Sequence, residues 1–277
     1  MAKNDNSSKV VLVTGASSGI GYEVALQLKA KNFIVYGAAR RADKLKALED
    51  RGIKTVILDV TDEDSMNSCV DTIVKKEGKI DILINNAGYG SYGAVEDVEI
   101  DEARRQFEVN LFGLASMTQK VLPYMRDNHF GRIINTSSMG GKAHTKFGAW
   151  YHATKFAVEG FSDCLRIETK EFGVDVVLVE PGMIRTNWGM IAADNLKKTS
   201  AGGAYEKQAS KYAKNFRKSY TSKRLTGPAR VAKEYVKACT ARKPKTRYLV
   251  GTFSHSLIFF RRILTDRMYD RIIASAI

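Results

Sequence analysis

The 277-residue sequence contains few residues of the kinds that would fix a fold by covalent or metal links. Its three cysteines, Cys69, Cys164 and Cys239, are odd in number and widely spaced, which argues against a disulfide framework and favours a reducing compartment. The four histidines are scattered and no Cys-x-x-Cys occurs, so no metal site is predicted. With four prolines and no low-complexity run, residues 1–277 are predicted to form a single domain.

Long hydrophobic runs are also missing. The first nine residues, MAKNDNSSK, are polar and lack the apolar region of a signal peptide. The longest strongly apolar run near the C-terminus, LIFF at residues 257–260, is far too short to cross a bilayer. We therefore expect a cytoplasmic protein.

Acidic residues are scarce in only one part of the chain. Residues 191–277 contain 20 Lys and Arg against 5 Asp and Glu, whereas residues 1–190 contain 24 against 25, so the net charge of +14 lies in the last third. Such a surface could bind nucleic acid, anionic lipid or an acidic substrate, or it could be an ordinary solvated face. Because no nucleic-acid-binding motif or pattern of stacking aromatics accompanies it, nucleic acid is not an expected partner.

Short apolar runs alternate with helical patterns through most of the chain. The runs predicted to be strands are residues 9–14, 32–39, 54–60, 80–88, 131–138 and 175–181, with a seventh at 247–251. This alternation predicts an α/β fold, a Rossmann-type doubly wound parallel sheet of about seven strands with helices on both faces. Residues 187–226 are polar and basic, and we expect helix there in pieces.

Three glycines, Gly15, Gly19 and Gly21, lie between the first predicted strand and the helix that follows it. Backbone N–H groups at a helix N-terminus form an anion site, and glycine lets a pyrophosphate approach the backbone. A glycine-rich turn can also serve packing alone, but the strand–turn–helix context favours a dinucleotide site.

Several motifs resemble those of the short-chain dehydrogenase/reductase family and occur in the family's order. They are TGASSGIG (14–21), NNAG (85–88), Asn110, Ser138, YHATK (151–155) and PGMIRT (181–186). Each lies at the strand or helix end where the family has it, over about two thirds of the chain. The resemblance implies an oxidoreductase that uses a nicotinamide dinucleotide.

The resemblance also implies which residues contact the cofactor. The expected cofactor-binding residues are Gly15, Ser17, Ser18, Gly19, Ile20, Arg40, Arg41, Asp59, Val60, Asn86, Ala87, Gly88, Tyr151, Lys155, Pro181, Gly182, Ile184 and Thr186. By the family pattern, Asp59 and Val60 flank the adenine, and Thr186 with the backbone near Ile184 holds the carboxamide.

The end of the second strand, GAARRADK, indicates the type of cofactor. In a Rossmann-type fold an acid at this point binds the ribose 2′-hydroxyl of NAD, whereas an arginine accommodates the 2′-phosphate of NADP. Here Ala39 takes the acid position and Arg40 and Arg41 follow. The sequence therefore predicts NADP(H), with Arg40 as the main contact and Arg41 or Ser17 assisting; the alternative is that both arginines are merely solvated.

Tyr151 and Lys155 lie one helical turn apart, so they share a helix face. Reduction of a carbonyl needs a proton donor, and a cation within ~4–6 Å lowers the pKa of a tyrosine from its free value near ~10. We expect Lys155 to act on Tyr151 in this way and Ser138 to donate to the same substrate oxygen, with Ser137 as a rival. The resemblance makes Asn110, through a local break in its helix, the orienter of a water near Lys155.

The predicted catalytic residues are Asn110, Ser138, Tyr151 and Lys155, and the predicted substrate residues are Ser138, Met139, His144, Tyr151, Met183 and Trp188. Residues 183–226 are expected to cover the substrate, and His152 is expected to be a bystander. The aromatic and methionine side chains near these positions indicate an apolar pocket. The resemblance is closest to members that act on lipophilic alcohols and ketones, such as steroids, retinoids or long-chain carbonyls.

We therefore predict an NADP(H)-dependent carbonyl reductase or alcohol dehydrogenase with Tyr151 as general acid/base and a small lipophilic carbonyl or alcohol as its substrate. The alternatives are a reductase of 3-oxoacyl thioesters and a non-catalytic NADP(H)-binding protein. An intact set of four catalytic residues argues against the second, because a sensor needs none of them.

The C-terminal tail, residues 251–277, is basic and amphipathic. Its apolar positions at helical spacing are Leu257, Phe260, Leu264, Met268 and Ile272, and Arg261, Arg262 and Arg267 lie elsewhere. Such a stripe either lies on a membrane surface or packs on the domain or on a partner subunit. Family members usually pair through the helices that carry Asn110 and Tyr151, so the resemblance implies a homodimer or homotetramer.

Overall fold

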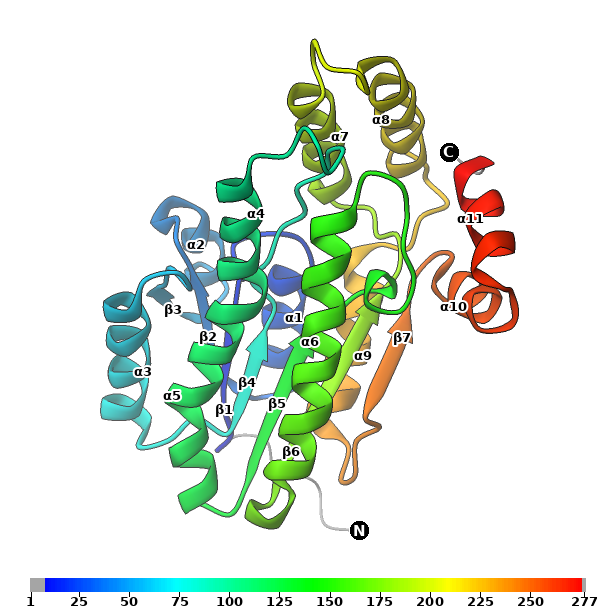
Figure 1. Ribbon diagram of the computed structural model, residues 1–277. Coiled ribbons are helices and arrows are strands. Elements are labelled where there is room, and N and C mark those ends of the chain that lie inside the picture. Colours follow the sequence, from blue (N-terminus) through cyan, green and yellow to red (C-terminus); the bar gives the residue numbers. More distant parts are fainter. Residues whose placement is uncertain (1–7, 276–277) are drawn as a thin grey trace.

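The computed structural model describes residues 8–275, which fold around a seven-stranded parallel sheet (Figure 1). The strands are β1 (Val10–Thr14), β2 (Ile34–Ala39), β3 (Lys54–Ile57), β4 (Ile82–Asn85), β5 (Gly131–Thr136), β6 (Val174–Pro181) and β7 (Arg247–Val250). Their order in the sheet is β3-β2-β1-β4-β5-β6-β7. The predicted fold class is confirmed; β3 and β4 are shorter than predicted, because residues 58–60 and 86–88 lie in loops at the C-terminal edge of the sheet.

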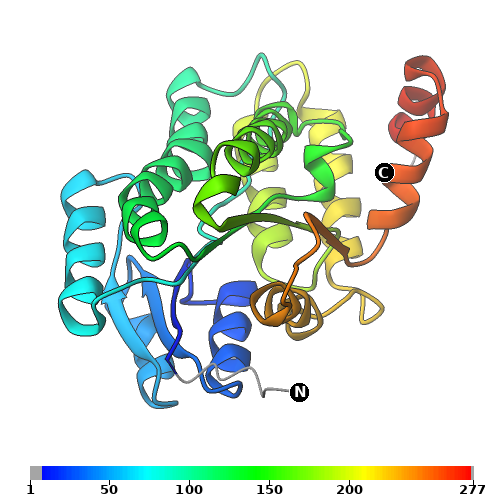
Figure 2. The same cartoon turned by 90° about the horizontal axis from the view of Figure 1, so that it is seen from below.

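Helices cover both faces of the sheet, as Figure 2 shows. One layer contains α1 (Gly19–Lys29), α2 (Ala42–Glu49) and α9 (Pro228–Thr240), and the other contains α3 (Glu63–Glu77), α5 (Gly113–Asp127) and α6 (Ala149–Glu168). Neighbouring residues of β1 point to opposite layers. Val11 and Val13 pack in the first core cluster, and Val10 and Leu12 in the second. Burial on both faces explains why β1 is a continuous apolar run.

The strand order reverses between β1 and β4, which opens a crevice at the C-terminal edge of the sheet. Above this edge the chain forms α4 (Ile100–Phe107), the π-helical segment η1 (Glu108–Phe112) and the short η2 (Met139–Gly141); η3 (Lys170–Phe172) follows α6. Helices α7 (Trp188–Thr199) and α8 (Glu206–Tyr220) also lie above the edge, at the top of Figure 1, and confirm the prediction of helix in pieces.

The C-terminal tail forms two helices, α10 (Ser254–Ile263) and α11 (Asp266–Ser275), at the side of the molecule beyond β7 (Figure 1). The chain is extended at Leu264, so the apolar positions noted in the sequence are divided between the two helices. No helix within residues 8–275 has the length and apolar character needed to span a bilayer. The same residues contain no group of three or more His, Cys, Asp and Glu side chains arranged to hold a metal ion.

Candidate active site

A cavity of about 1550 Å³ opens at the C-terminal edge of the sheet. All of the expected cofactor-binding residues line it, as do Ser138, Met139, Tyr151, Lys155, Met183 and Trp188. Asn110 lies behind its wall, and His144 lies outside it. The structure therefore brings together nearly every site residue that the sequence indicated, and the cavity is continuous from the glycine turn to α7 and α8.

The glycine turn is packed so closely that side chains are excluded from it. Gly15 and Gly19 have positive φ angles of 66° and 59°, which favour glycine. A Cβ atom on Gly21 would lie 2.5 Å from the backbone oxygen of Gly15. Ser18 precedes the first turn of α1, and Ser18, Gly19 and Ile20 all line the cavity. This is the cradle that a dinucleotide pyrophosphate requires.

The NNAG segment after β4 fixes the glycine turn in place. The Thr14 hydroxyl accepts hydrogen bonds from the backbone N–H groups of Asn86 and Ala87, both at 3.0 Å. The Asn86 side-chain amide donates to the backbone oxygens of Thr14 at 3.0 Å and Gly15 at 3.2 Å. These hydrogen bonds therefore hold together two motifs that are about 70 residues apart in sequence.

At the far end of the crevice, Arg40 follows β2 and extends into solvent, with 72% of its side chain exposed. Its Nη1 atom lies 4.0 Å from the Asp59 carboxylate, and Arg41 lines the same wall. The contact between Arg40 and Asp59 is weak, because it is long and exposed. The guanidinium is thus available for an anionic group at this end.

Tyr151, Lys155 and Ser138 meet near the middle of the cavity. Tyr151 and Lys155 lie on the first turns of α6 and are both buried. The Lys155 ammonium donates to the backbone oxygen of Thr136 at 2.8 Å. The Ser138 hydroxyl accepts from the backbone N–H of Gly140 at 3.0 Å and is near enough to the Tyr151 hydroxyl to influence its pKa. A Cβ atom on Gly141 would lie 2.7 Å from the Ser137 hydroxyl and 2.9 Å from the backbone oxygen of Lys155, so Ser137 turns toward α6. Ser138, not its rival, faces Tyr151.

The two titratable side chains of this group are both shifted toward their neutral forms. Burial raises the pKa of Tyr151 to about 12, and its hydrogen bond with Ser138 offsets only part of this effect. Burial lowers the pKa of Lys155 to about 8, which Glu159 partly opposes. The expected lowering of the Tyr151 pKa by Lys155 is thus wrong for the chain by itself, because removal of water from the phenol dominates.

Asn110 lies in the π-helical segment η1, which connects α4 to α5. Its side-chain oxygen accepts from the backbone N–H of Tyr89 at 3.0 Å, and its amide donates to the Tyr89 backbone oxygen at 2.9 Å and the Thr154 hydroxyl at 3.1 Å. Asn110 therefore ties the loop after β4 to α6. A π-segment at a functional position is common, and the predicted break in the helix is present.

His152 has a structural task that the sequence did not reveal. Its Nε2 atom accepts from the backbone N–H of Thr145 at 3.0 Å, so Nδ1 carries the proton and donates to the Gly140 backbone oxygen at 2.9 Å. Burial lowers its pKa, which keeps the ring neutral. His152 thereby holds the loop between Ser138 and Tyr151 in position.

The end of the cavity near α7 and α8 is lined by aromatic side chains from distant parts of the chain. The Tyr151 ring lies 5.9 Å from Tyr92 and 5.1 Å from Trp188 between centroids, and Phe216 and Tyr220 of α8 complete the wall. Trp188 was among the substrate residues predicted from the sequence, but Phe216 and Tyr220 were missed. A spacing signal existed, since Tyr212, Phe216 and Tyr220 recur at every fourth position of α8.

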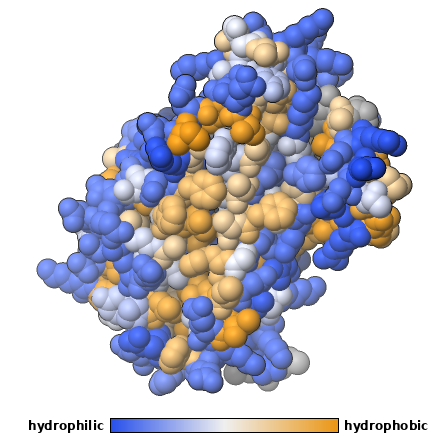
Figure 3. All heavy atoms as spheres, in the orientation of Figure 1, coloured by the Kyte–Doolittle hydropathy of each residue, from blue (hydrophilic) through white to orange (hydrophobic). Residues whose placement is uncertain are grey.

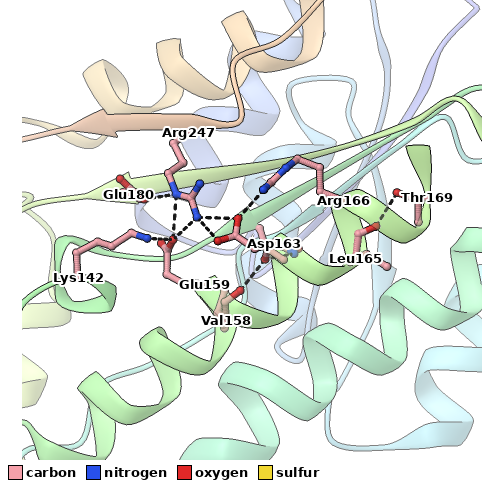
Figure 4. Close-up of polar contacts among 11 residues, drawn as sticks. Lys142, Val158, Glu159, Asp163, Leu165, Arg166, Thr169, Glu180 and Arg247 are labelled. Carbon is pink, nitrogen blue, oxygen red and sulfur yellow. Dashed lines mark hydrogen bonds and ion pairs between the residues drawn. The ribbon is translucent and has the colours of Figure 1, made fainter. Parts of the chain in front are cut away.

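A cluster of charged side chains, in which Glu159 and Glu180 are buried, includes residues of α6 that follow Lys155 (Figure 4). Arg247 of β7 contacts Glu159 at 3.2 Å, Glu180 at 3.2 Å and Asp163 at 2.6 Å, and Lys142 contacts Glu159 at 2.9 Å. Burial and the neighbouring Glu159 carboxylate raise the pKa of Glu180. The cluster joins α6, the end of β6, β7 and the segment after η2, so it fixes the elements that carry Lys155 and Pro181.

The residues present fit a dinucleotide. The glycine turn leaves no room for side chains, and it leads into the N-terminus of α1. An arginine lines the other end of the crevice, which opens where the strand order reverses. The fold and this site define a Rossmann-type oxidoreductase. Residues 9–196 match the family model for short chain dehydrogenase. The chain belongs to the short-chain dehydrogenase/reductase family.

Curated relatives match the chain over most of its length. It is 37% identical over 261 residues to the "Probable short-chain type dehydrogenase/reductase VdlC" of Helicobacter pylori, with 94% of this chain and 95% of the relative covered. An NADPH-dependent 3-dehydrocapnine reductase of Ornithobacterium rhinotracheale is 33% identical over 276 residues, with 95% of each chain covered. A 3-ketodihydrosphingosine reductase of Bacteroides thetaiotaomicron is 41% identical over 181 residues, 65% of each chain.

Solved structures share the fold along the same length. A short-chain dehydrogenase from Streptomyces avermitilis superposes with a TM-score of 0.80 at 31% identity and covers 96% of both chains. Serine dehydrogenase complexed with NADP⁺ has a TM-score of 0.77 at 25% identity, with 88% of this chain and 95% of that chain covered.

Proposed function

We propose that this chain is an NADP(H)-dependent oxidoreductase that interconverts a lipophilic carbonyl and the corresponding secondary alcohol, with Tyr151 as general acid/base. The observation that carries the proposal is the meeting of Tyr151, Ser138 and Lys155 where the cofactor crevice joins the aromatic end of the cavity. The Asn110 contacts to Tyr89 and Thr154 support the same geometry.

The roles follow from the chemistry of these groups. When bound, the nicotinamide would supply or accept the hydride. In reduction, the Tyr151 hydroxyl gives its proton to the carbonyl oxygen as the C–O bond becomes an alcohol, and Ser138 donates a hydrogen bond to that oxygen. Lys155 stabilises the phenolate left behind. Asn110 is proposed to orient a water near Lys155 that returns the proton.

The preference for NADP(H) rests on the end of β2. Arg40 and Arg41 line the cavity there, and Ala39 occupies the place of the acid that binds the 2′-hydroxyl of NAD. The NADPH-dependent relative and the NADP⁺-bound serine dehydrogenase support this preference. A planar guanidinium suits a phosphate because it can form two parallel hydrogen bonds.

The proposed substrate is apolar around its carbonyl. The segment 183–226 contributes Met183, Trp188, Phe216 and Tyr220 to the cavity, in agreement with its proposed role as a cover. Two relatives are named for 3-keto or 3-dehydro substrates, which supports a ketone.

A homodimer or homotetramer and a cytoplasmic location complete the proposal. Figure 3 shows an apolar band over the face that α5 and α6 form in Figure 1, and Phe112 and Phe156 are about half exposed on η1 and α6. A second copy of this face would cover them. The three cysteines are unpaired, as expected in a reducing compartment.

The test follows NADPH absorbance against a panel of ketones and aldehydes, with NADH in parallel. Tyr151→Phe should bind NADPH normally and lose turnover by about 10²–10⁴-fold, the usual contribution of a positioned proton donor. Full activity of Tyr151→Phe would refute the role of the tyrosine.

Cofactor choice is tested by Arg40→Ala, with the exposed Arg51→Ala as a matched control. Arg40→Ala should raise KM for NADPH far more than KM for NADH, and Arg51→Ala should change neither. Turnover with NADH but not NADPH in the unaltered protein would overturn the assignment.

A further inference from the structure

The two tail helices expose apolar side chains that neither the sheet nor α1–α9 covers. Phe253, Phe259, Phe260, Ile263 and Met268 are between 47% and 60% exposed. The sequence left open whether the whole apolar stripe packs on the domain. In the structure it does not. In Figure 3, apolar and polar side chains lie next to one another at the edge where Figure 1 places α10 and α11.

Basic side chains surround this apolar surface. Arg262 and Arg267 are exposed on the tail, and its acids are already engaged: Asp266 pairs with Arg261 at 2.9 Å and Asp270 with His144 at 3.0 Å. Helix α8 has one buried aromatic face, while its opposite face exposes Lys207, Lys211, Lys214 and Lys218.

The apolar tail and the basic helix border the same opening. Phe216, Ser219 and Tyr220 of α8 line the cavity from one side, and Phe253, Leu257 and Phe260 line it from the other. The substrate end of the cavity is thus framed by an apolar surface with lysines and arginines around it. The charge of +15 in residues 191–277 is concentrated in the part of the chain that contains this rim.

We propose that the rim formed by α8, α10 and α11 docks on an anionic lipid bilayer, so that the cavity opens toward the membrane. Apolar side chains among basic ones are the surface that an interfacial helix presents to lipid. A symmetric contact with a second copy would set the same basic surface against itself, which is unfavourable. An anionic bilayer instead attracts each basic side chain, by about fivefold in affinity. Docking concerns the rim alone and does not depend on the proposed reaction.

The experiment is co-sedimentation of the full chain with vesicles of phosphatidylcholine alone or with phosphatidylserine added, at low and high salt. We expect binding only to the anionic vesicles, weakened by salt. The charge variant Lys211→Gln/Lys214→Gln/Lys218→Gln should lose roughly a hundredfold in affinity, at about fivefold per lysine. The apolar variant Phe259→Ser/Ile263→Ser/Met268→Ser should release the protein at all salt concentrations. None of these residues lines the cavity.

Control variants lie away from the rim, on α3 and at the C-terminal end of α6 (Figure 1). Lys75→Gln/Lys76→Gln changes exposed lysines of α3, and Ile167→Ser removes an apolar side chain that is 74% exposed at the end of α6. Both should bind as the unaltered protein does, and circular dichroism melting checks that each variant folds.

Absence of binding to anionic vesicles, or equal binding by the charge and control variants, would overturn the proposal. A loss of self-association in the apolar variant, measured by light scattering, with unchanged vesicle binding would assign the surface to a second copy instead. NADPH oxidation with a water-soluble ketone is measured separately. Vesicle binding without turnover would support docking and count only against the proposed reaction.

Discussion

Replacement of Lys155 by methionine is expected to stabilise the fold at neutral pH while it removes activity. Burial lowers the pKa of Lys155 from 10.5 to about 8, because the folded protein disfavours the charged ammonium. The difference between these pKa values corresponds to ~3 kcal/mol of destabilisation at pH 7, where the side chain is charged in both the folded and the unfolded chain. Methionine has a similar length and no charge, so it removes this cost.

The gain is reduced by the hydrogen bond that methionine cannot make. Lys155 donates to the Thr136 backbone oxygen at 2.8 Å, and a bond of this kind contributes ~1 kcal/mol. The expected net stabilisation is therefore ~2 kcal/mol, or about 4 °C in Tm for a chain of this size.

The pH dependence separates this explanation from better packing. The pKa of Lys155 is lower in the folded than in the unfolded protein. The destabilisation caused by the buried ammonium therefore disappears as pH rises from about 8 to 10.5, and it returns as pH falls. The advantage of Lys155→Met should thus be full below pH 8 and vanish toward pH 10.5. Urea denaturation of both proteins at pH 7 and pH 10 measures it, with exposed Lys75→Met as control. A less stable variant at pH 7, or an advantage that persists at pH 10, would refute the reasoning.

Three further variants test other parts of the site. Gly21→Ala places a Cβ atom 2.5 Å from the Gly15 backbone oxygen and should weaken NADPH binding at least tenfold, as measured by fluorescence titration. Arg247→Leu leaves the buried Glu180 carboxylate without its ion-pair partner, while Glu159 keeps Lys142, and should cost ~3–5 kcal/mol at pH 8 in urea denaturation; the cost should be smaller at pH 5, where the Glu180 carboxyl, whose pKa is raised, is protonated. His152→Ala should raise KM for ketones more than KM for NADPH, because it loosens the loop at residues 140–145.

Local patterns were sufficient to predict the sheet and the crevice. A buried parallel strand such as β1 is a continuous apolar run, and its glycine turn has to follow directly, so sequence order alone places both. The ends of parallel strands meet at one edge, and the motifs at 85–88 and 181–186 therefore had to converge there. The broken helix at Asn110 came from family resemblance, since the residues around it show ordinary helical periodicity.

Features that depend on tertiary contacts could not be predicted. His152 looked like a bystander because the atoms it holds, Gly140 O and Thr145 N, belong to a loop of irregular structure. Phe216 and Tyr220 were missed because their segment is polar overall; their four-residue spacing predicts an apolar helix face, but only the tertiary structure shows that this face lines the cavity. His144 was expected to line the substrate pocket; the structure directs it to Asp270, and its backbone oxygen accepts from the Tyr269 hydroxyl at 3.1 Å. Nothing near His144 in sequence indicated α11.

The pKa of Tyr151 shows how burial and chemistry combine at this site. Burial raises it to about 12, so the chain's own residues keep the phenol protonated at neutral pH. A protonated phenol with Ser138 as its hydrogen-bond partner is already the donor that carbonyl reduction needs. Oxidation of the alcohol needs Tyr151 as a phenolate. The buried surroundings disfavour this charged form, so a cationic nicotinamide would have to stabilise it. The residues themselves therefore favour proton donation. The pH–rate profile for reduction should be flat from pH 6 to 7 and fall as the pH approaches 8, where Lys155 loses its proton.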